Sequence, residues 1–158
     1  MVELSPSAQR VQDAIHATGL VCKVVELPDS TRTAQEAADA VNCQVGQIIK
    51  SLVFRGKQSG KGIFVAASGA NRVNEKRLKE LAGEGIERAT PDFVRETTGF
   101  AIGGVSPVGH LQQMESYIDQ DLLGYGELWA AAGTPNAVFR LTPAELTHLT
   151  SGRVIGIT

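Results

Sequence analysis

The segment Ile-Ile-Lys-Ser-Leu-Val-Phe-Arg, residues 48–55, decides the fold that this sequence predicts. It is rich in β-branched and aromatic side chains over eight residues, which is typical of a strand. The segment Gly-Ile-Phe-Val-Ala-Ala-Ser, residues 62–68, predicts a neighbouring strand. The glycine-bounded residues 56–62 between them predict the turn that joins the pair.

Helix start signals occur on both sides of this strand pair. Apolar residues recur at helical spacing after Pro6, and Gly19 follows as a stop. Thr33 and Glu36 have the spacing of a capping box, which predicts a helix that ends near residue 42. Three more helices are predicted behind a capping residue, at Asn74, at Thr90-Pro91 and at Thr142-Pro143.

The other regular segments are short and extended. Strands are predicted over residues 22–27, 86–89, 100–102, 116–118, 127–132, 137–141 and 153–157. Because the helices alternate irregularly with these strands, the predicted class is α+β. We expect a compact, mixed, largely antiparallel, barrel-like sheet with short helices packed outside. No repeat or linker divides residues 1–158, which are predicted to form a single domain.

The composition excludes several classes of protein. The chain has 158 residues, of which 42% are hydrophobic and 20% charged, and its apolar runs are too short to span a membrane. Residues 1–4, Met-Val-Glu-Leu, lack the pattern of a secretory signal, so we expect a cytoplasmic protein. The net charge of −2 does not supply the broad positive field of a DNA-binding protein, so any nucleic acid must be bound locally.

Cysteine and histidine are too sparse to predict a metal centre or a disulfide framework. Cys22 and Cys43 stand alone, and we expect both to be reduced. The three histidines, His16, His110 and His148, form no close pair, so neither a metal nor a cofactor is expected. His110 could act as a general base, but a loop histidine without an orienting carboxylate is more often a surface residue.

Lys50 is the first candidate functional residue. On a strand its side chain points the same way as those of Leu52 and Phe54, which places a cation among apolar neighbours. Such a lysine reaches solvent, meets a carboxylate or binds an anionic ligand. Reaching solvent is the commoner outcome, and the opposite face with Ile49 and Val53 is also apolar, so both interpretations of Lys50 stay open.

A glycine-rich stretch at residues 98–110, Thr-Gly-Phe-Ala-Ile-Gly-Gly-Val-Ser-Pro-Val-Gly-His, is the second candidate. Glycine admits positive φ and lets backbone amides approach a ligand closely. Gly104 and Gly109 have the spacing of P-loop glycines, but His110-Leu111 replaces the required Lys-Ser/Thr. No Gly-x-Gly-x-x-Gly is present either, so a tight structural turn without a ligand is an equal alternative.

Two further features have a simple structural explanation. The loop Gly-Thr-Pro-Asn that begins at Gly133 lies between predicted strands and is explained by a hairpin turn. Arg72, Lys76 and Lys79 have the spacing of one helix face, which is more often a solvated surface than a phosphate-binding one.

Three motifs in this order resemble the YbaK family, the free-standing relatives of the editing domain of bacterial prolyl-tRNA synthetases. They are Ile-Lys-Ser-Leu-Val-Phe at residues 49–54, the stretch at residues 98–109, and Ala132-Gly133 followed by Val-Phe-Arg-Leu at residues 138–141. The resemblance implies a hydrolase that cuts the ester between a wrongly attached amino acid and the terminal adenosine of a tRNA. The partner it implies is the acceptor end of an aminoacyl-tRNA, with a synthetase as a further candidate and no membrane or DNA.

The resemblance also implies roles for individual residues. Lys50 would hold the terminal nucleotide as the catalytic residue, and Gly133 would match the glycine of the last loop. Asp119 matches an aspartate to which no role is assigned. The walls of the aminoacyl pocket would be Gly103, Gly104, Ser106, Pro107 and Gly109.

The chain departs from the cysteine-clearing branch of that family at two places. His-Leu-Gln-Gln at residues 110–113 replaces basic residues after the glycine stretch, and Gly-Thr-Pro-Asn at residues 133–136 replaces a basic turn. The amino acid that is cleared is therefore left open. A non-catalytic module that binds a tRNA end, a nucleotide or a synthetase also stays open as an alternative, because no acid–base pair is evident in the sequence.

Overall fold

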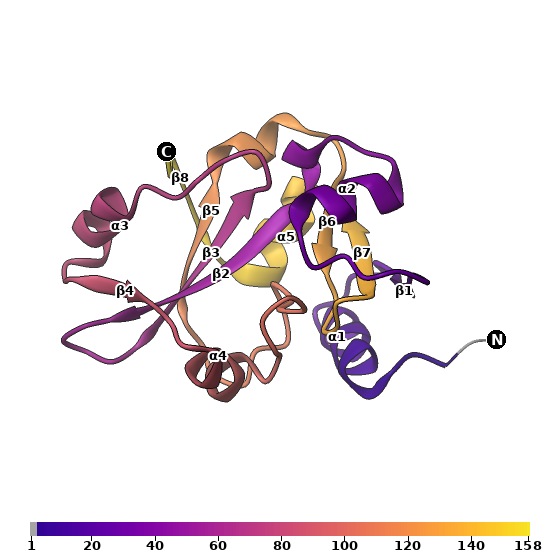
Figure 1. The fold of residues 1–158 in the computed structure, drawn as a ribbon, viewed down its shortest axis with the longest axis horizontal. Coiled ribbons are helices and arrows are strands. Elements are labelled where there is room, and N and C mark those ends of the chain that lie inside the picture. Colours follow the sequence, from indigo (N-terminus) through magenta and orange to yellow (C-terminus); the bar gives the residue numbers. More distant parts are fainter. Residues whose placement is uncertain (1–2) are drawn as a thin grey trace.

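The computed structural model describes residues 3–158. Met1 and Val2, which belong to the N-terminal segment used for the signal prediction, lie outside the described residues. The described chain has a mixed α+β fold with five α-helices and two β-sheets (Figure 1). The helices are α1 (Pro6–Ala17), α2 (Ala34–Val41), α3 (Glu75–Ala82), α4 (Pro91–Thr98) and α5 (Pro143–Thr150). The strands are β1 (Val24–Glu26), β2 (Ile49–Gly56), β3 (Gly62–Ser68), β4 (Ile86–Arg88), β5 (Glu115–Asp119), β6 (Leu128–Ala131), β7 (Ala137–Leu141) and β8 (Arg153–Ile155).

The two sheets contain both parallel and antiparallel pairs. The larger sheet has the order β4-β2-β3-β5-β8, and the smaller one has the order β1-β7-β6. Only the β3–β5 and β5–β8 pairs are parallel, and the others are antiparallel. The prediction of a mixed, largely antiparallel arrangement is confirmed.

The prediction of a barrel is wrong for residues 3–158. The two sheets touch through one isolated bridge, between Ile48 and Trp129, and no ladder closes them into a cylinder. The physical reason lies at the outer edge of β2. The short strand β4 pairs with residues 54–56 alone, so the edge between Ile49 and Leu52 lacks a partner strand.

The helices begin and end where the sequence predicts. Thr33 and Thr142 each complete a capping box, with Glu36 and Glu145 respectively, and so satisfy otherwise unpaired amides of the first turn. Asn74 and Thr90 cap α3 and α4 through their side chains. Helix α4 ends at a residue in the left-handed region, Gly99 with φ of 81°. These local signals make the helix boundaries predictable.

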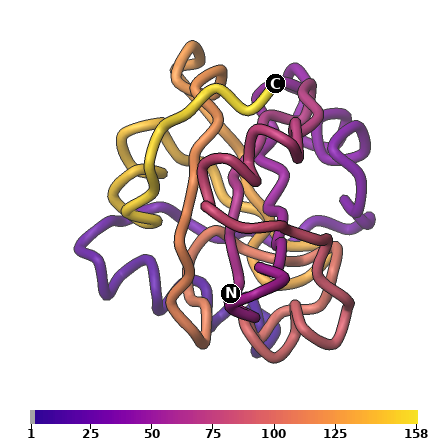
Figure 2. Tube along the Cα trace, turned by 90° about the vertical axis from the view of Figure 1, so that its left-hand side faces the viewer, coloured from indigo at the N-terminus to yellow at the C-terminus, as the bar shows by residue number. Residues whose placement is uncertain are grey.

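Two apolar clusters lie on opposite faces of the β2–β3 pair. Ile49, Val53 and Phe64 belong to the larger cluster, which also contains residues of α1 and of the smaller sheet. Phe54 and Val65 belong to the other cluster, together with residues of α3 and the C-terminal segment. That segment lies beside the loop that precedes α3, as Figure 2 shows, and the two are joined by a main-chain hydrogen bond. Both faces of β2 are therefore covered.

The predicted strand at residues 100–102 is absent. Gly99 has φ of 81° and Gly103 has φ of 98°, and the Gly104 amide donates to the Ala101 carbonyl at 3.0 Å, which closes a turn over residues 101–104. This geometry is a turn, because glycine in the left-handed region reverses the chain. None of the helices in residues 3–158 combines the length and apolar character that crossing a membrane requires.

Candidate functional site

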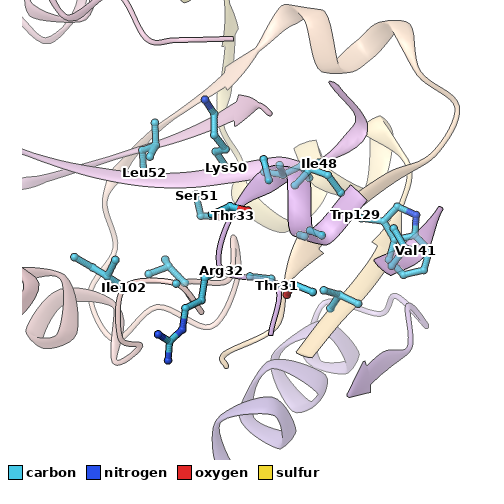
Figure 3. Close-up of a pocket in the computed structure, with 18 residues that line it drawn as sticks. Thr31, Arg32, Thr33, Val41, Ile48, Lys50, Ser51, Leu52, Ile102 and Trp129 are labelled. Atoms are coloured by element: carbon cyan, nitrogen blue, oxygen red, sulfur yellow. The ribbon is translucent and has the colours of Figure 1, made fainter. Parts of the chain in front are cut away.

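A cavity of about 290 Å³ opens at the unpaired edge of β2 (Figure 3). Its walls come from the loop at residues 31–34, from α2, from residues 48–52, from the turn at residues 102–105 and from residues 129–131 of β6. The volume is at the lower end of the range for small-ligand sites, and most of the lining is apolar with a few hydroxyl and cationic groups. The cavity therefore suits a small group rather than a bulky one.

A second cavity of about 250 Å³ adjoins the first on the β4 side. Ser51, Leu52, Ile102 and Gly103 line both. The second cavity continues to Val53, Phe54, Arg88 and Val94. The two cavities are thus neighbouring compartments that share a wall made by β2 and the turn at residues 102–105.

Polar main-chain groups of β2 point into this opening. The Val53 carbonyl accepts from the Ala89 amide at 3.2 Å, which places the polar backbone groups of Val53 on the β4 side. Backbone polar groups alternate in direction along a strand, so the amide and carbonyl of Ser51 point to the same side. β4 does not reach Ser51, and these two groups are left at the open edge.

Lys50 contributes to the wall of the first cavity, but its ammonium group lies on the other side of β2. Figure 3 shows Lys50 and Leu52 extending to one side of the strand and Ser51 to the other. The Lys50 ammonium donates to the Asn71 carbonyl. The structure therefore confirms that Lys50 shares a face with Leu52, and it separates this ammonium from Gly103 by the width of the strand.

The charge around Lys50 is positive. Burial lowers the pKa of the Lys50 ammonium, and the neighbouring Arg72 and Arg88 lower this pKa further, while Asp119 opposes them. Arg32 lines the first cavity and Arg88 the second, and no carboxylate lines either. An anion bound beside the Lys50 ammonium would relieve its repulsion by Arg72 and Arg88.

Of the four predicted site glycines, Gly103 lines both cavities, whereas Gly104 and Gly133 lie where the chain is closely packed. A Cβ on Gly104 would lie 2.8 Å from Thr134 Cα, and a Cβ on Gly133 would lie 2.6 Å from the Ser7 carbonyl oxygen. The Gly133 amide also donates to the Gly104 carbonyl at 2.9 Å. Gly104 thus permits the close approach of the two loops behind the cavity wall, and Gly133 permits the close approach of its loop to the start of α1.

Ser106, Pro107 and Gly109 lie behind the turn and line neither cavity. Ser106 Oγ accepts from the Val108 amide at 3.1 Å, and the Ser106 carbonyl contacts His110 Nε2 at 2.7 Å. Ser106 and Pro107 are buried and Gly109 is partly buried, so any part these three residues have in the pocket is through the shape of the turn.

Arg10 of α1 ties the two ends of the glycine-rich stretch together. Its Nη1 donates to the Gly99 carbonyl at 3.2 Å, and its Nη2 donates to the carbonyls of Thr98 at 2.7 Å and Gly109 at 3.1 Å. The guanidinium also lies 3.9 Å from the centroid of the Phe100 ring. Sequence reasoning missed this contact, because a single arginine on a predicted helix gives no signal for it.

Asp119, which is buried, and His110, which is partly buried, both contact loop main chain, and the sequence left their roles open. Asp119 is 1% exposed and accepts from the Ser68 amide, the Asn71 side chain and the Asp121 amide, each at 2.9 Å. It thereby fixes the loop whose Asn71 carbonyl receives Lys50. Burial lowers the pKa of His110, so this imidazole is neutral at pH 7 and lies outside both cavities.

Cys22 lies in a separate hollow next to Glu145. Its Sγ lies 3.4 Å from Glu145 Oε2, and burial together with that carboxylate raises the pKa of the Cys22 thiol to about 11. A thiol of this kind is a poor nucleophile at neutral pH. Residues 3–158 contain no cluster of three His, Cys, Asp or Glu side chains that could hold a metal ion.

Among the cavity residues that were not predicted are Thr31, Arg32 and Trp129, and also Ser51, which lies within the predicted motif. The first three come from a loop and from β6, so their approach depends on tertiary packing. Ser51 had a signal in the sequence, because it is the polar residue on the face of β2 that carries Ile49 and Val53.

Comparisons with known proteins show the family to which the chain belongs. The model of the aminoacyl-tRNA editing domain family matches residues 28–149. YwhH of Bacillus subtilis is 32% identical over 131 residues, which are 83% of each chain. EbsC of Enterococcus faecalis, assigned as a Cys-tRNA(Pro)/Cys-tRNA(Cys) deacylase, is 28% identical over 80% of this chain and 77% of its own.

Proline–tRNA ligase of Kosmotoga olearia is 40% identical over 90 residues, which are 55% of this chain and 15% of the ligase. A solved structure assigned as a trans-editing enzyme for prolyl-tRNA synthetase covers 99% of both chains, with 54% identity and a TM-score of 0.93. The chain belongs to the aminoacyl-tRNA editing domain family, which is related to the editing domain of prolyl-tRNA synthetase.

Proposed function

We propose that this protein is a trans-acting aminoacyl-tRNA deacylase, which hydrolyses the ester between a wrongly attached amino acid and the terminal adenosine of a tRNA. The family and the activities assigned to its relatives support this reaction class. The observation that carries the proposal is that β2 holds the Lys50 ammonium on one side and, on the other, lines a small cavity together with Gly103.

In this proposal Lys50 binds a phosphate of the terminal nucleotide. An ammonium group has three N–H donors, and one of those of Lys50 is used by the Asn71 carbonyl. The positive charges of Arg72 and Arg88 add to the attraction for a phosphate. This local patch meets the requirement that a chain of net charge −2 bind nucleic acid locally.

The aminoacyl group occupies the compartments on the Ser51 side of β2, against the turn that contains Gly103. An aminoacyl ester is already activated, so orienting it and stabilising the developing oxyanion with main-chain amides is sufficient for catalysis. Water attacks the ester carbonyl and the bond to the ribose oxygen breaks. The ribose oxygen leaves as a hydroxyl group with one proton of the water, and the amino acid leaves as its carboxylate after the other proton passes to solvent. Gly104, Ser106, Pro107, Gly109 and Gly133 support the turn from behind.

A panel of mischarged tRNAs tests this proposal. Catalytic amounts of protein are expected to release the amino acid from at least one of them over many turnovers. Lys50→Ala is expected to lower kcat/KM by roughly 10²- to 10³-fold, the scale of losing one preorganised electrostatic contact. Lys57→Ala is the matched control, because Lys57 is exposed in the turn beyond β2. A Lys50→Ala protein with the wild-type rate would remove Lys50 from the mechanism.

A non-catalytic module that binds a tRNA end is the second candidate. The observation that favours it is that, in the described part of the chain, neither cavity is lined by a histidine, a cysteine or a carboxylate that could act as a base. Saturable binding of the mischarged tRNAs without release of any amino acid would support the module and contradict the deacylase.

A further inference from the structure

Ser51 carries a buried hydroxyl that has no hydrogen-bond partner within residues 3–158. Buried polar atoms are nearly always paired, because leaving one unpaired costs stability. Ser51 lines both compartments of the cavity, so its hydroxyl is close to the space that a ligand would fill. The missing partner is thus placed where a substrate atom can supply it.

The main chain adds two more polar groups at the same point. The Ser51 amide and carbonyl face the open edge of β2, since β4 pairs with residues 54–56 alone. One residue therefore offers a hydroxyl, an N–H donor and a carbonyl acceptor. The wall across from it contains Gly103 and Ile102.

The chemistry of the cavity limits which substrate group can be recognised here. Every aminoacyl ester has an α-amino group, which donates hydrogen bonds and must be matched when it leaves water. Within residues 3–158 no carboxylate lines either compartment, so the acceptors there are neutral oxygens. Thr33 Oγ1 is occupied by the cap of α2, and Thr31 Oγ1 donates to the Pro135 carbonyl at 2.7 Å. Of the hydroxyls that line the first cavity, that of Ser51 is the one without a hydrogen bond within residues 3–158, so it is the acceptor that a ligand can engage without sharing.

We propose that Ser51 binds the α-amino group of the aminoacyl ester through its hydroxyl and carbonyl oxygens, and so turns the ester toward the Gly103 turn. This inference rests on the proposed function, which supplies the aminoacyl ester. Ser51 would thus recognise the α-amino group that all aminoacyl esters share, independently of the amino acid side chain. Lys50, on the other side of the same strand, is left to hold the nucleotide.

If Ser51 binds substrate, Ser51→Ala should lower activity without lowering stability. If Ser51 had only a structural role, the same substitution would lower both. Ser51→Ala removes an unpaired buried hydroxyl, so the melting temperature is expected to stay constant or rise. The same substitution removes one hydrogen bond to the substrate, so kcat/KM is expected to fall about 10-fold.

The experiment uses the mischarged tRNA that wild type hydrolyses fastest and the matching acyl-tRNA with hydrogen in place of the α-amino group. Ser51→Ala is expected to slow hydrolysis of the first about 10-fold and of the second less than twofold. The matched control is Ser5→Ala, since Ser5 Oγ is likewise buried and unpaired within residues 3–158 but lies outside the cavity. It is expected to hydrolyse both substrates at the wild-type rate.

Three results would overturn the role of Ser51 alone. They are a Ser51→Ala rate within twofold of wild type on the mischarged tRNA, an equal loss on both substrates, or a loss accompanied by a fall in melting temperature of more than about 4 °C. A wild-type protein that hydrolyses no mischarged tRNA would instead remove the proposed function itself, and this inference with it.

Discussion

Replacing Arg10 by alanine is expected to destabilise the protein by about 2 to 4 kcal/mol. Arg10 is half-buried on α1 and donates to the carbonyls of Thr98, Gly99 and Gly109. It thus joins the residues that begin and end the loop carrying Gly103. Its guanidinium stays charged although burial lowers the pKa of Arg10, because that pKa starts far above neutrality.

The magnitude follows from the contacts that are lost. A hydrogen bond from a charged group contributes up to about 3 kcal/mol when fully buried, and partial exposure of Arg10 reduces each of the three to roughly 0.5 to 1 kcal/mol. The stacking of the guanidinium 3.9 Å from the Phe100 ring adds about 0.5 to 1 kcal/mol. For a domain of this size the sum corresponds to a fall of very roughly 4 to 16 °C in melting temperature.

Urea unfolding of wild type and Arg10→Ala at pH 7.5 measures this difference. Arg95→Ala is the control, because Arg95 is exposed on α4 and such substitutions usually change stability by less than about 0.5 kcal/mol. The midpoint should fall for Arg10→Ala with an unchanged slope. Equal midpoints for the two variants would refute the idea that Arg10 fixes the loop.

Two further predictions concern buried positions near the site. Burial lowers the pKa of His110, so below about pH 6.5 the unfolded chain binds a proton at this residue more readily than the folded protein does, and the folded protein loses stability. His110→Asn should therefore lower the free energy of unfolding less at pH 5.5 than at pH 7.5, as measured by urea titration. An equal cost at both pH values would contradict this. Gly104→Ala should lower the free energy of unfolding by about 1 to 3 kcal/mol, because the added Cβ would lie 2.8 Å from the Thr134 backbone. Gly126→Ala is the control, since a Cβ there would have no atom within 4 Å, and it should leave the melting temperature nearly unchanged. Similar melting temperatures for both glycine variants would show that the loops can move apart.

Much of the fold could be predicted because its signals are local. Capping residues such as Thr33 and Thr142 act on amides within one turn, so the helix starts follow from short segments of sequence. The strand pair β2–β3 follows from two apolar segments around one turn. The strand expected at residues 100–102 is wrong because the glycines at positions 99 and 103 take positive φ, which overrides the apolar content between them.

The site could be predicted only in part, because β2 is apolar on both faces. The alternation correctly grouped Lys50 with Leu52, but which face borders the cavity depends on the pairing of β2 with β3 and on the clusters that cover it. The open edge beside Ser51 depends on how far β4 extends, which no short segment of sequence determines. Nor could the missing barrel closure be foreseen, since it depends on contacts between distant strands.

The most direct test of the account is a crystal structure with a non-hydrolysable analogue, an amide of an amino acid with 3′-amino-3′-deoxyadenosine 5′-phosphate. The account predicts that the aminoacyl part lies between Ser51 and the Gly103 turn, and that the phosphate lies within reach of the Lys50 ammonium. An analogue bound instead in the hollow beside Cys22 and Glu145, with the cavity at β2 left vacant, would contradict it.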